Sequence, residues 1–325
     1  MSEIVLQTQH LTKRYGALTA VDDLSLEVHA GEIFGFLGPN GAGKTTAINL
    51  ICGLLKPDAG QVFIHDKPVN GPGIRDGGAE VRARVGVCPQ NTILWDKLTC
   101  LEQLEFIGEM YNMPSKLARA RGSELLEILG LAEKRRRLAS TLSGGMKRRL
   151  NLALALVHDP EIVVLDEPEA GLDPQSRVLV REYIQSLAAS RGGRSRTVIL
   201  TTHKMDEADR MADRVAIIDH GKLLVLDAPE ALKQRLGQGD TVEIKLEDGL
   251  EDEAKARQVL QDIASDVKLE TEARILHVRA LHAVGRLADI LQALTAAGFR
   301  PGEVSLRTNS LEDVFIQLTG RRLRE

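Results

Sequence analysis

Short apolar runs alternate with helical segments over the first two thirds of the chain. Each run is bounded by turn-forming or polar residues, as the buried strands of a parallel sheet are. The runs lie at residues 32–37, 84–88, 161–165, 197–200 and 215–218. Segments with helical spacing, such as residues 47–52 and 176–190, separate them. This alternation predicts an α/β fold whose mostly parallel sheet is covered on both faces.

One stretch inside this pattern, residues 91–158, contains no convincing strand. Thr99 and Glu102 have the spacing of a capping box at the start of an apolar helix. A second helix is expected to end at Gly130. We therefore expect a helical subdomain inserted into the sheet domain.

The pattern changes near residue 237. Residues 241–246 alternate apolar and polar side chains, which predicts a strand with one wet face. The segments that follow predict the order β-α-β-β-α-β, and a last short helix ends the chain. We therefore expect a first domain at residues 1–236 and a small C-terminal α+β domain at residues 237–325.

The composition is that of an ordered globular protein, with 325 residues, 43% hydrophobic and 27% charged. The net charge of −4 gives no global reason to expect a nucleic-acid partner, and the basic run at residues 134–137 is interpreted as a solvated face. Cys52, Cys88 and Cys100 lack metal-ligand spacing, so we expect buried thiols. There is no signal-peptide core and no apolar run near the roughly 18 residues that span a bilayer, which predicts a cytoplasmic protein.

Residues 38–46 fit the pattern G-x-x-x-x-G-K-[ST] between an apolar strand and a helix. The residues expected to contact phosphate are Gly38, Pro39, Asn40, Gly41, Ala42, Gly43, Lys44, Thr45 and Thr46. Glycines let the backbone N–H groups and the positive end of the helix point at a polyphosphate. Lys44 adds a cation for the β- and γ-phosphates, and the Thr45 hydroxyl is a ligand for Mg²⁺. The loop therefore predicts a site for ATP with Mg²⁺.

Other polar residues follow the apolar strands. Asp166 and Glu167 end one strand, where Asp166 can reach Mg²⁺ and Glu167 can orient or deprotonate an attacking water. Gln90 follows another strand, at the edge where doubly wound sheets bind ligands. Short strands are expected at residues 4–6 and 24–28, with a polar turn at residues 13–16 between them. Tyr15 in this turn is either a platform for adenine or a half-buried strand residue, and its position alone favours neither.

The segment at residues 142–146, Leu-Ser-Gly-Gly-Met, precedes an apolar helix and leaves N–H groups bare at a capped helix start. It resembles the signature motif of ATP-binding cassette (ABC) ATPases, and the resemblance covers about the first 230 residues. The other motifs occur in the order of that family: the A-loop Tyr15, Walker A at 38–46, the Q-loop Gln90, Walker B at 162–167, the D-loop at 171–173 and the switch His203.

The resemblance implies a P-loop NTPase fold and assigns roles. The catalytic residues that it implies are Glu167 as general base, His203, Gln90 and Lys44. The magnesium ligands that it implies are Thr45, Gln90 and Asp166. Tyr15 would stack on adenine. Because two copies sandwich two nucleotides in this family, Ser143, Gly144 and Gly145 would contact the ATP held by the second copy.

Two positions depart from the commonest family pattern. Met146 stands where glutamine is usual, which is similar to the drug-exporter subunits that serve ABC-2 type permeases. The ending at residues 310–315 resembles the same subfamily. Glu169 replaces a small hydroxyl residue, and we expect its charge near the interface between copies to weaken closure of the dimer.

The resemblance implies the ATP-hydrolysing subunit of an ABC exporter, held at the inner face of the cell membrane by a separate permease that docks near Trp95. The alternative is a soluble ABC ATPase acting on ribosomes or DNA. Those proteins resemble fused cassettes or a cassette split by a coiled coil, and neither feature occurs here. A switch that barely hydrolyses ATP is a third hypothesis, disfavoured by Glu167 and His203. No motif after residue 237 implies chemistry, so a regulatory or dimer-supporting role is the hypothesis for that domain.

Overall fold

The structure is a computed structural model, and it describes residues 3–71, 83–189, 195–236, 239–247, 252–280 and 283–320. The chain divides into two compact units, Met1–Asp227 and Ala228–Glu325. The sequence analysis placed this division after residue 236, whereas the structure groups helix α8 (Pro229–Leu236) with the second unit. There the Asn309 side chain donates a 2.7 Å hydrogen bond to the carbonyl oxygen of Lys233 in α8.

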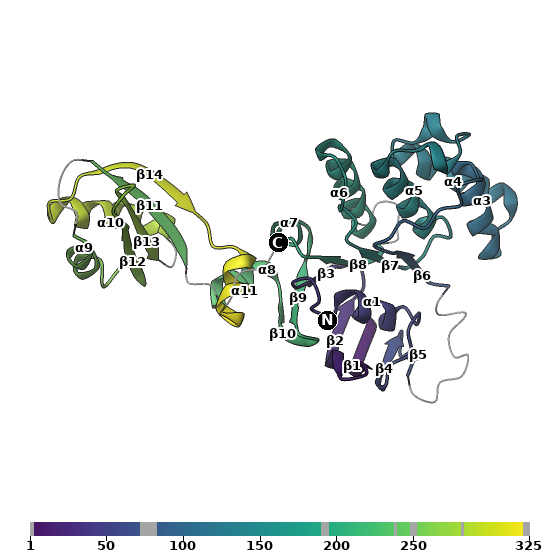
Figure 1. Ribbon diagram of the computed structural model, residues 1–325, viewed down its shortest axis with the longest axis horizontal. Helices are drawn as coiled ribbons and strands as arrows, with labels where there is room; N and C mark the ends of the chain where they lie inside the picture. Colours follow the sequence, from purple (N-terminus) through teal and green to yellow (C-terminus); the bar gives the residue numbers. More distant parts are fainter. Residues whose placement is uncertain are drawn as a thin grey trace. The chain divides into compact units, whose positions relative to one another are not determined.

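A six-stranded sheet in the order β10-β9-β3-β8-β7-β6 forms the centre of the first unit (Figure 1). Its strands are β3 (Ile33–Leu37), β6 (Val85–Cys88), β7 (Ile162–Asp166), β8 (Thr197–Thr202), β9 (Arg214–Asp219) and β10 (Lys222–Asp227). All are parallel except β10, which pairs with β9 as an antiparallel edge. The predicted α/β fold with a mostly parallel sheet is confirmed.

Helices pack on both faces of this sheet, and several of them come from residues 91–158. The helices of this unit, with two 3-10 turns, are α1 (Lys44–Ile51), α3 (Cys100–Met110), α4 (Ser115–Ile128), η1 (Ala132–Lys134), η2 (Ala139–Thr141), α5 (Gly144–Leu156), α6 (Pro174–Ala188) and α7 (Met205–Met211). The predicted capping box is present at α3, where the Glu102 N–H donates to Thr99 Oγ1 at 3.3 Å and the Thr99 N–H donates to Glu102 Oε2 at 2.8 Å.

Alternate side chains of the parallel strands enter two separate hydrophobic cores. Phe36 on β3 and Val164 on β7 pack on the side of α1, whereas Val163 and Leu165 pack on the side of α5. Successive side chains of a strand point to opposite faces, so a continuous apolar run fills both cores. In Figure 1, α1 lies below the central sheet and α5 and α6 lie above it.

A second sheet, in the order β2-β1-β4-β5, contributes to the core on the α1 side. Its strands are β1 (Ile4–Tyr15), β2 (Leu18–His29), β4 (Ala59–Ile64) and β5 (Lys67–Asn70). The sequence analysis expected two short strands and a polar turn at residues 13–16. That was wrong, because β1 and β2 remain paired down to Tyr15 and Leu18. The hairpin turns at Gly16. Its φ is 59°, a value that glycine adopts without strain.

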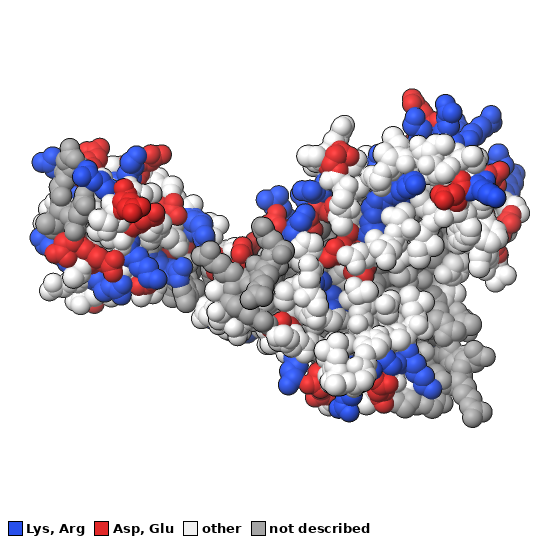
Figure 2. All heavy atoms as spheres, in the orientation of Figure 1, with Lys and Arg blue, Asp and Glu red and all other residues white. Residues whose placement is uncertain are grey.

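The second unit is built on an antiparallel sheet in the order β12-β13-β11-β14. Its further elements are β11 (Asp240–Leu246), α9 (Glu253–Val259), β12 (Asp266–Glu270), β13 (Ile275–Ala280), α10 (Ala283–Ala296), β14 (Pro301–Arg307) and α11 (Leu311–Thr319). The order β-α-β-β-α-β is that of the ferredoxin-like fold, which confirms the predicted small α+β domain. Acidic and basic side chains are interspersed over the face of this unit that Figure 2 shows.

The remaining general predictions can be compared with the structure directly. All three cysteines are free and buried, and burial raises the pKa of the Cys52 thiol to about 12. Among the described residues, no helix is long and apolar enough to cross a bilayer. Residues 70–78 are rich in glycine and proline, which predicts an exposed loop, and from position 72 onward they lie outside the described residues.

Gly86 on β6 marks a close approach between the sheet and α5. A Cβ added there would lie 2.0 Å from the carbonyl oxygen of Ala155 and 2.7 Å from Cγ of Pro160. Gly86→Ala is therefore expected to lower the free energy of unfolding by about 1–3 kcal/mol, as overpacking does. Urea denaturation would measure this. Gly285→Ala is the control, because a Cβ there meets no atom within 4 Å; an unchanged midpoint for Gly86→Ala would contradict the close contact.

Candidate functional site

The glycine-rich loop at residues 38–46 connects the end of β3 to the start of α1. Two positions of this loop require glycine, because backbone carbonyl oxygens of neighbouring strands approach them closely. A Cβ on Gly38 would lie 2.3 Å from the carbonyl oxygen of Ile218, and one on Gly43 would lie 2.2 Å from that of Ala20. Gly43 also has a φ of 102°, which residues with side chains rarely adopt. The loop is therefore held between β9 and β2 with a helix N-terminus at its end, an arrangement suited to an anion.

Lys44 is the first residue of α1, and its side chain folds back along the loop. Nζ donates hydrogen bonds to the carbonyl oxygens of Gly38 at 2.6 Å and Pro39 at 3.0 Å. Burial lowers the pKa of Lys44, while the carboxylates of Glu167 and Asp166 raise it in part. The ammonium group is thus already placed inside the loop, where it binds carbonyl oxygens.

The carboxyl ends of β7 and β8 bring a carboxylate to this loop. Thr45 Oγ1 donates to Asp166 Oδ2 at 3.0 Å, and Thr201 Oγ1 donates to Asp166 Oδ1. Asp166 and Thr201 are neighbours because the parallel strands β7 and β8 pair at these two residues. Each oxygen of the carboxylate is therefore fixed by one hydroxyl, and one of these hydroxyls belongs to the loop helix.

Glu167 joins the ends of three strands. Its side chain accepts a hydrogen bond from Gln90 Nε2 at 3.1 Å and lies 2.8 Å from His203 Nδ1. Gln90 follows β6 and His203 follows β8. The Glu167 carboxylate therefore contacts side chains at the ends of both neighbouring strands. Glu167 has a φ of 50°, and its N–H is bound by the Thr201 carbonyl and hydroxyl oxygens at 3.1 and 3.0 Å. Such a strained backbone, held by several contacts, is typical of functional sites.

Arg148 on α5 is a residue of this site that the sequence analysis missed. Nη1 donates to the carbonyl oxygens of Pro89 at 2.5 Å and Gln90 at 3.0 Å, and Nη2 donates to those of Asp166 at 2.5 Å and Glu167 at 2.8 Å. Its rigid planar fork therefore holds the ends of β6 and β7 together. The sequence carried no signal for this, since an arginine in a basic run on a helix usually faces solvent.

Two predicted groups lie apart from this cluster within one chain. Tyr15 is 50% exposed at the end of β1, with Lys13 Nζ 5.8 Å from the centre of its ring. Ser143 caps α5 by accepting a 3.3 Å hydrogen bond from the N–H of Met146. Among the described residues, no hydrogen bond joins residues 143–145 to the loop at 38–46, and Figure 1 places α5 and α1 on opposite sides of the sheet.

Glu169 does not behave as the sequence analysis expected. Its side chain has no exposed surface, and Arg181 holds it with two hydrogen bonds, from Nε at 3.0 Å and from Nη2 at 2.8 Å. Arg177 Nε lies 3.8 Å away as a second cation. The expectation that this charge acts at an interface between copies is wrong, because the carboxylate is buried and neutralised within its own chain.

The donor set at the strand ends fits Mg²⁺ only together with a polyphosphate. No group of three or more His, Cys, Asp or Glu side chains among the described residues could hold a metal ion. Thr45 and Asp166 are nevertheless in contact, and Gln90 is linked to Glu167 beside them. Mg²⁺ commonly binds through one or two carboxylates while substrate phosphates and waters complete its shell, and these oxygen donors meet that requirement.

Comparisons with known proteins agree with this geometry. The ABC transporter family profile matches residues 21–170. A daunorubicin resistance ATP-binding protein of Streptomyces coeruleorubidus is 36% identical over 327 residues, which cover 100% of this chain and 99% of that protein. A Nod factor export ATP-binding protein of Ralstonia nicotianae is 38% identical over 322 residues, 99% of this chain and 95% of that protein.

Among solved structures, a dimeric ATP-binding cassette in a post-hydrolysis state with ADP and Pi bound is similar to this chain. The TM-score is 0.61 and the identity 25%, over 69% of this chain and 98% of that one. The similarity supports the predicted P-loop NTPase fold, and the full-length identity to curated relatives supports the resemblance found in the motifs. The chain therefore belongs to the ABC transporter family, as one of its ATP-binding, ATP-hydrolysing proteins.

Proposed function

We propose that this chain hydrolyses ATP at the cluster of Lys44, Thr45, Asp166 and Glu167 and thereby drives a separate export permease. The observation that carries the proposal is the contact of Glu167 with both Gln90 and His203, beside the loop that holds Lys44. A carboxylate set at the edge of a phosphate-binding loop is placed to act on a water at the γ-phosphate.

The chemistry follows from the side chains of this cluster. Lys44 exchanges its two loop carbonyl oxygens for phosphate oxygens, which carry more negative charge. Thr45, Asp166 and Gln90 would hold Mg²⁺, which supplies positive charge to the phosphates. Glu167 accepts a proton from water as the water oxygen bonds to the γ-phosphorus and the bond to ADP breaks. His203 keeps the Glu167 carboxylate in place through its 2.8 Å contact and would also contact the γ-phosphate.

A second copy is needed to complete this site. Ser143, Gly144 and Gly145 lie on the face of the sheet opposite α1, so they do not contact the loop of their own chain. A Cβ on Gly144 would meet no atom within 4 Å, which leaves this helix start open to a partner. We assign it to the ATP of the second copy, as the family resemblance implies, and a cassette of similar fold is dimeric. Tyr15, exposed on its hairpin, is assigned to the adenine.

The permease contact is assigned to an exposed apolar patch next to Gln90. The rings of Trp95 and Phe106 pack edge to face with their centroids 5.4 Å apart, yet 40% and 43% of their surfaces remain exposed. The exposed fractions of Ile93 and Met110 are larger. Neighbouring exposed apolar side chains of this kind mark interaction sites. The relatives named for drug resistance and for Nod factor export favour an export permease as the partner. The chain would then be cytoplasmic and peripheral to the inner face of the membrane.

Glu167→Gln tests the assignment of the general base. The amide keeps the size of the side chain but cannot accept a proton, so we expect kcat to fall by at least about 100-fold while ATP binding is retained. Lys44→Ala is the contrasting variant, because loss of the ammonium should abolish ATP binding. Fluorescent-nucleotide binding and steady-state phosphate release would measure both. Near-normal turnover in Glu167→Gln would remove the proposed role.

Arg148→Lys tests whether the guanidinium positions Gln90 and Glu167. A lysine cannot reach four carbonyl oxygens with a planar fork, so we expect kcat to fall about tenfold with an unchanged KM for ATP. The control is Arg149→Lys, because the Arg149 Nη1 binds the carbonyl oxygens of Leu129 and Gly130 in the helical subdomain instead. Equal losses of kcat in the two variants, or a loss explained by a lowered melting temperature alone, would rule out a positioning role.

Trp95→Ser combined with Phe106→Ser tests the permease contact. The wild-type chain should co-purify with a multispanning membrane protein from membranes of its own cells, and the double variant should lose that protein while retaining ATPase activity. Leu54→Ser is the control, because Leu54 is 64% exposed outside this patch. Recovery of ribosomal or DNA-repair proteins alone would argue for the soluble alternative instead.

A further inference from the structure

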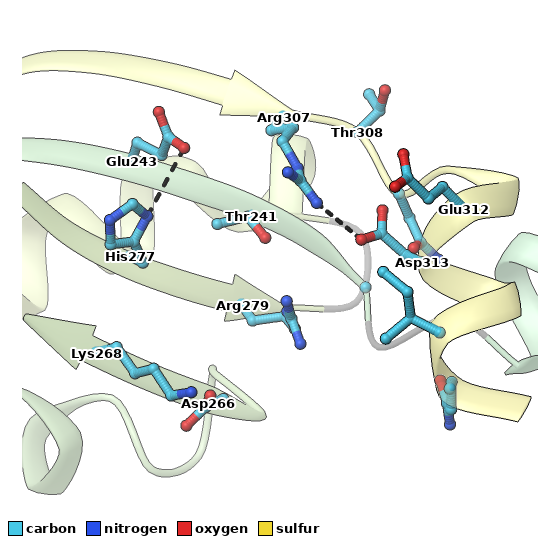
Figure 3. Close-up of a pocket in the computed structure, with 14 residues that line it drawn as sticks. Thr241, Glu243, Asp266, Lys268, His277, Arg279, Arg307, Thr308, Glu312 and Asp313 are labelled. Atoms are coloured by element: carbon cyan, nitrogen blue, oxygen red, sulfur yellow. Dashed lines mark hydrogen bonds and ion pairs between the residues drawn. The ribbon is translucent and has the colours of Figure 1, made fainter. Parts of the chain in front are cut away.

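The sheet of the second unit has one apolar face and one polar face. Buried side chains such as Val242, Ile244 and Val278 pack against α9 and α10. The opposite face carries Thr241, Glu243 and their cross-strand neighbours, since side chains alternate along a strand. On this polar face lies a cavity of about 710 Å³, bounded at one end by α11 (Figure 3).

The register of the sheet aligns side chains of four strands across this cavity. Thr241 on β11 lies opposite Arg279 on β13 and Arg307 on β14, so a hydroxyl is flanked by two guanidinium groups. Neighbouring strands are about 4.8 Å apart, so both long side chains can reach a group placed over Thr241. Lys268 on β12 is a diagonal neighbour of Arg279, because Asp266 pairs with Arg279 and Lys268 with His277.

Most carboxylates around the cavity already have partners. Arg307 Nη2 donates to Asp313 Oδ1 at 2.7 Å. The other pairs are Asp266 with Arg257 at 3.3 Å, and Glu243 with His277 at 3.7 Å and with the Ser305 hydroxyl at 3.1 Å.

Three charged groups remain after these pairs are counted. Within the part of the chain that the structure describes, the side chains of Arg279 and Lys268 have no hydrogen-bond or ion-pair partner, and among the lining carboxylates only Glu312 has none. Arg279 and Lys268 are therefore the two lining cations whose charged groups are free to contact a bound anion. Arg279 is only half-exposed, so its guanidinium is partly desolvated before any anion binds.

We propose that this cavity binds a small organic molecule that carries a carboxylate or phosphate group. The anionic group lies over Thr241, accepts hydrogen bonds from Arg279 and from the Thr241 hydroxyl, and is approached by Arg307 and Lys268. Guanidinium groups bind such planar or tetrahedral anions with two parallel hydrogen bonds. The volume lies within the roughly 300–1,000 Å³ of small-molecule sites.

The wall formed by α11 is fixed by hydrogen bonds, which distinguishes the cavity from an ordinary solvated sheet face. Ser310 and Asp313 form a capping box at its first turn. The Asn309 N–H donates to Asp240 Oδ1 at 3.0 Å, which ties the start of α11 to the start of β11. Figure 3 shows Arg307 and Asp313 directed toward each other across this corner. The site is thus largely formed before a ligand binds, so less ordering is needed on binding.

The test is calorimetric titration of the full-length chain with succinate and with glycerol 3-phosphate at constant ionic strength. Saturating ADP fills the loop at residues 38–46, so that neither probe binds there. We expect one site per chain for at least one probe. Arg279→Met should weaken its affinity by about tenfold or more, the loss expected when hydrogen bonds to a charged group are removed.

Lys245→Met is the matched control, because Lys245 is exposed on the same face of β11 but outside the cavity. It should leave the affinity unchanged, and melting curves should show that both variants are folded. Three results would overturn the proposal: no saturable binding of either probe, an equal loss in Lys245→Met, or binding only to phosphatidylglycerol vesicles, which would indicate a lipid surface. None of these results depends on the ATPase rate. Failure of this proposal can therefore be distinguished from failure of the proposed function.

Discussion

The backbone carbonyl groups at the ends of β6 and β7 impose the constraint on which the proposed catalytic cluster depends. These strands are buried on both faces, and the chain must leave them at Pro89–Gln90 and Asp166–Glu167, where the strand ladder no longer supplies partners. A buried carbonyl without a partner costs about 1–3 kcal/mol. The Arg148 guanidinium meets four of them at once. The positions of Gln90 and Glu167 therefore depend on a side chain from α5.

This dependence links two sites on one rigid element. Ser143 caps α5, and Arg148 lies five residues further along the same helix. The segment assigned to the partner's nucleotide and the group that holds the chain's own Glu167 therefore move together whenever α5 moves as a body. A helix of 13 residues with a buried, hydrogen-bonded arginine is a short and stiff connection. In the proposed dimer, coupling between the two nucleotide sites would thus require no long chain of contacts.

The motifs could be found from the sequence because their chemistry is local. The loop at residues 38–46 combines glycines, a lysine and a threonine within one strand-loop-helix unit, and Asp166 and Glu167 end an apolar run. Thr201 and Arg148 could not be found this way, since their roles come from pairing with β7 and from packing across the sheet. Lys13 to Tyr15 were misassigned to a turn for a related reason, because their polarity reflects an exposed strand end that only the pairing with β2 reveals.

Glu169 shows that residue type does not determine which way a side chain points. A carboxylate after Glu167-Pro168 was expected at the surface, where charged residues usually lie. Two arginines on α6, Arg177 and Arg181, lie along the same side of the helix and draw it inward. The spacing of four residues between Arg177 and Arg181 can be seen in the sequence. The packing of α6 against this turn cannot be predicted from it. A paired carboxylate here fixes the turn between β7 and α6.

In both sheets of this chain, the faces that are covered decide where polar groups can be presented. The two sheets differ in which faces are covered. The central sheet is covered on both faces, so only its strand ends are free to present polar groups, and the proposed catalytic cluster lies at that edge. The sheet of the second unit is covered on one face by α9 and α10, so its polar groups form rows across the open face instead. Strand register then decides which charges meet: it places Asp166 beside Thr201 in one sheet and Thr241 between two arginines in the other. Both sites are thus consequences of pairing, and a shift of one residue in either sheet would turn the side chains to the opposite face.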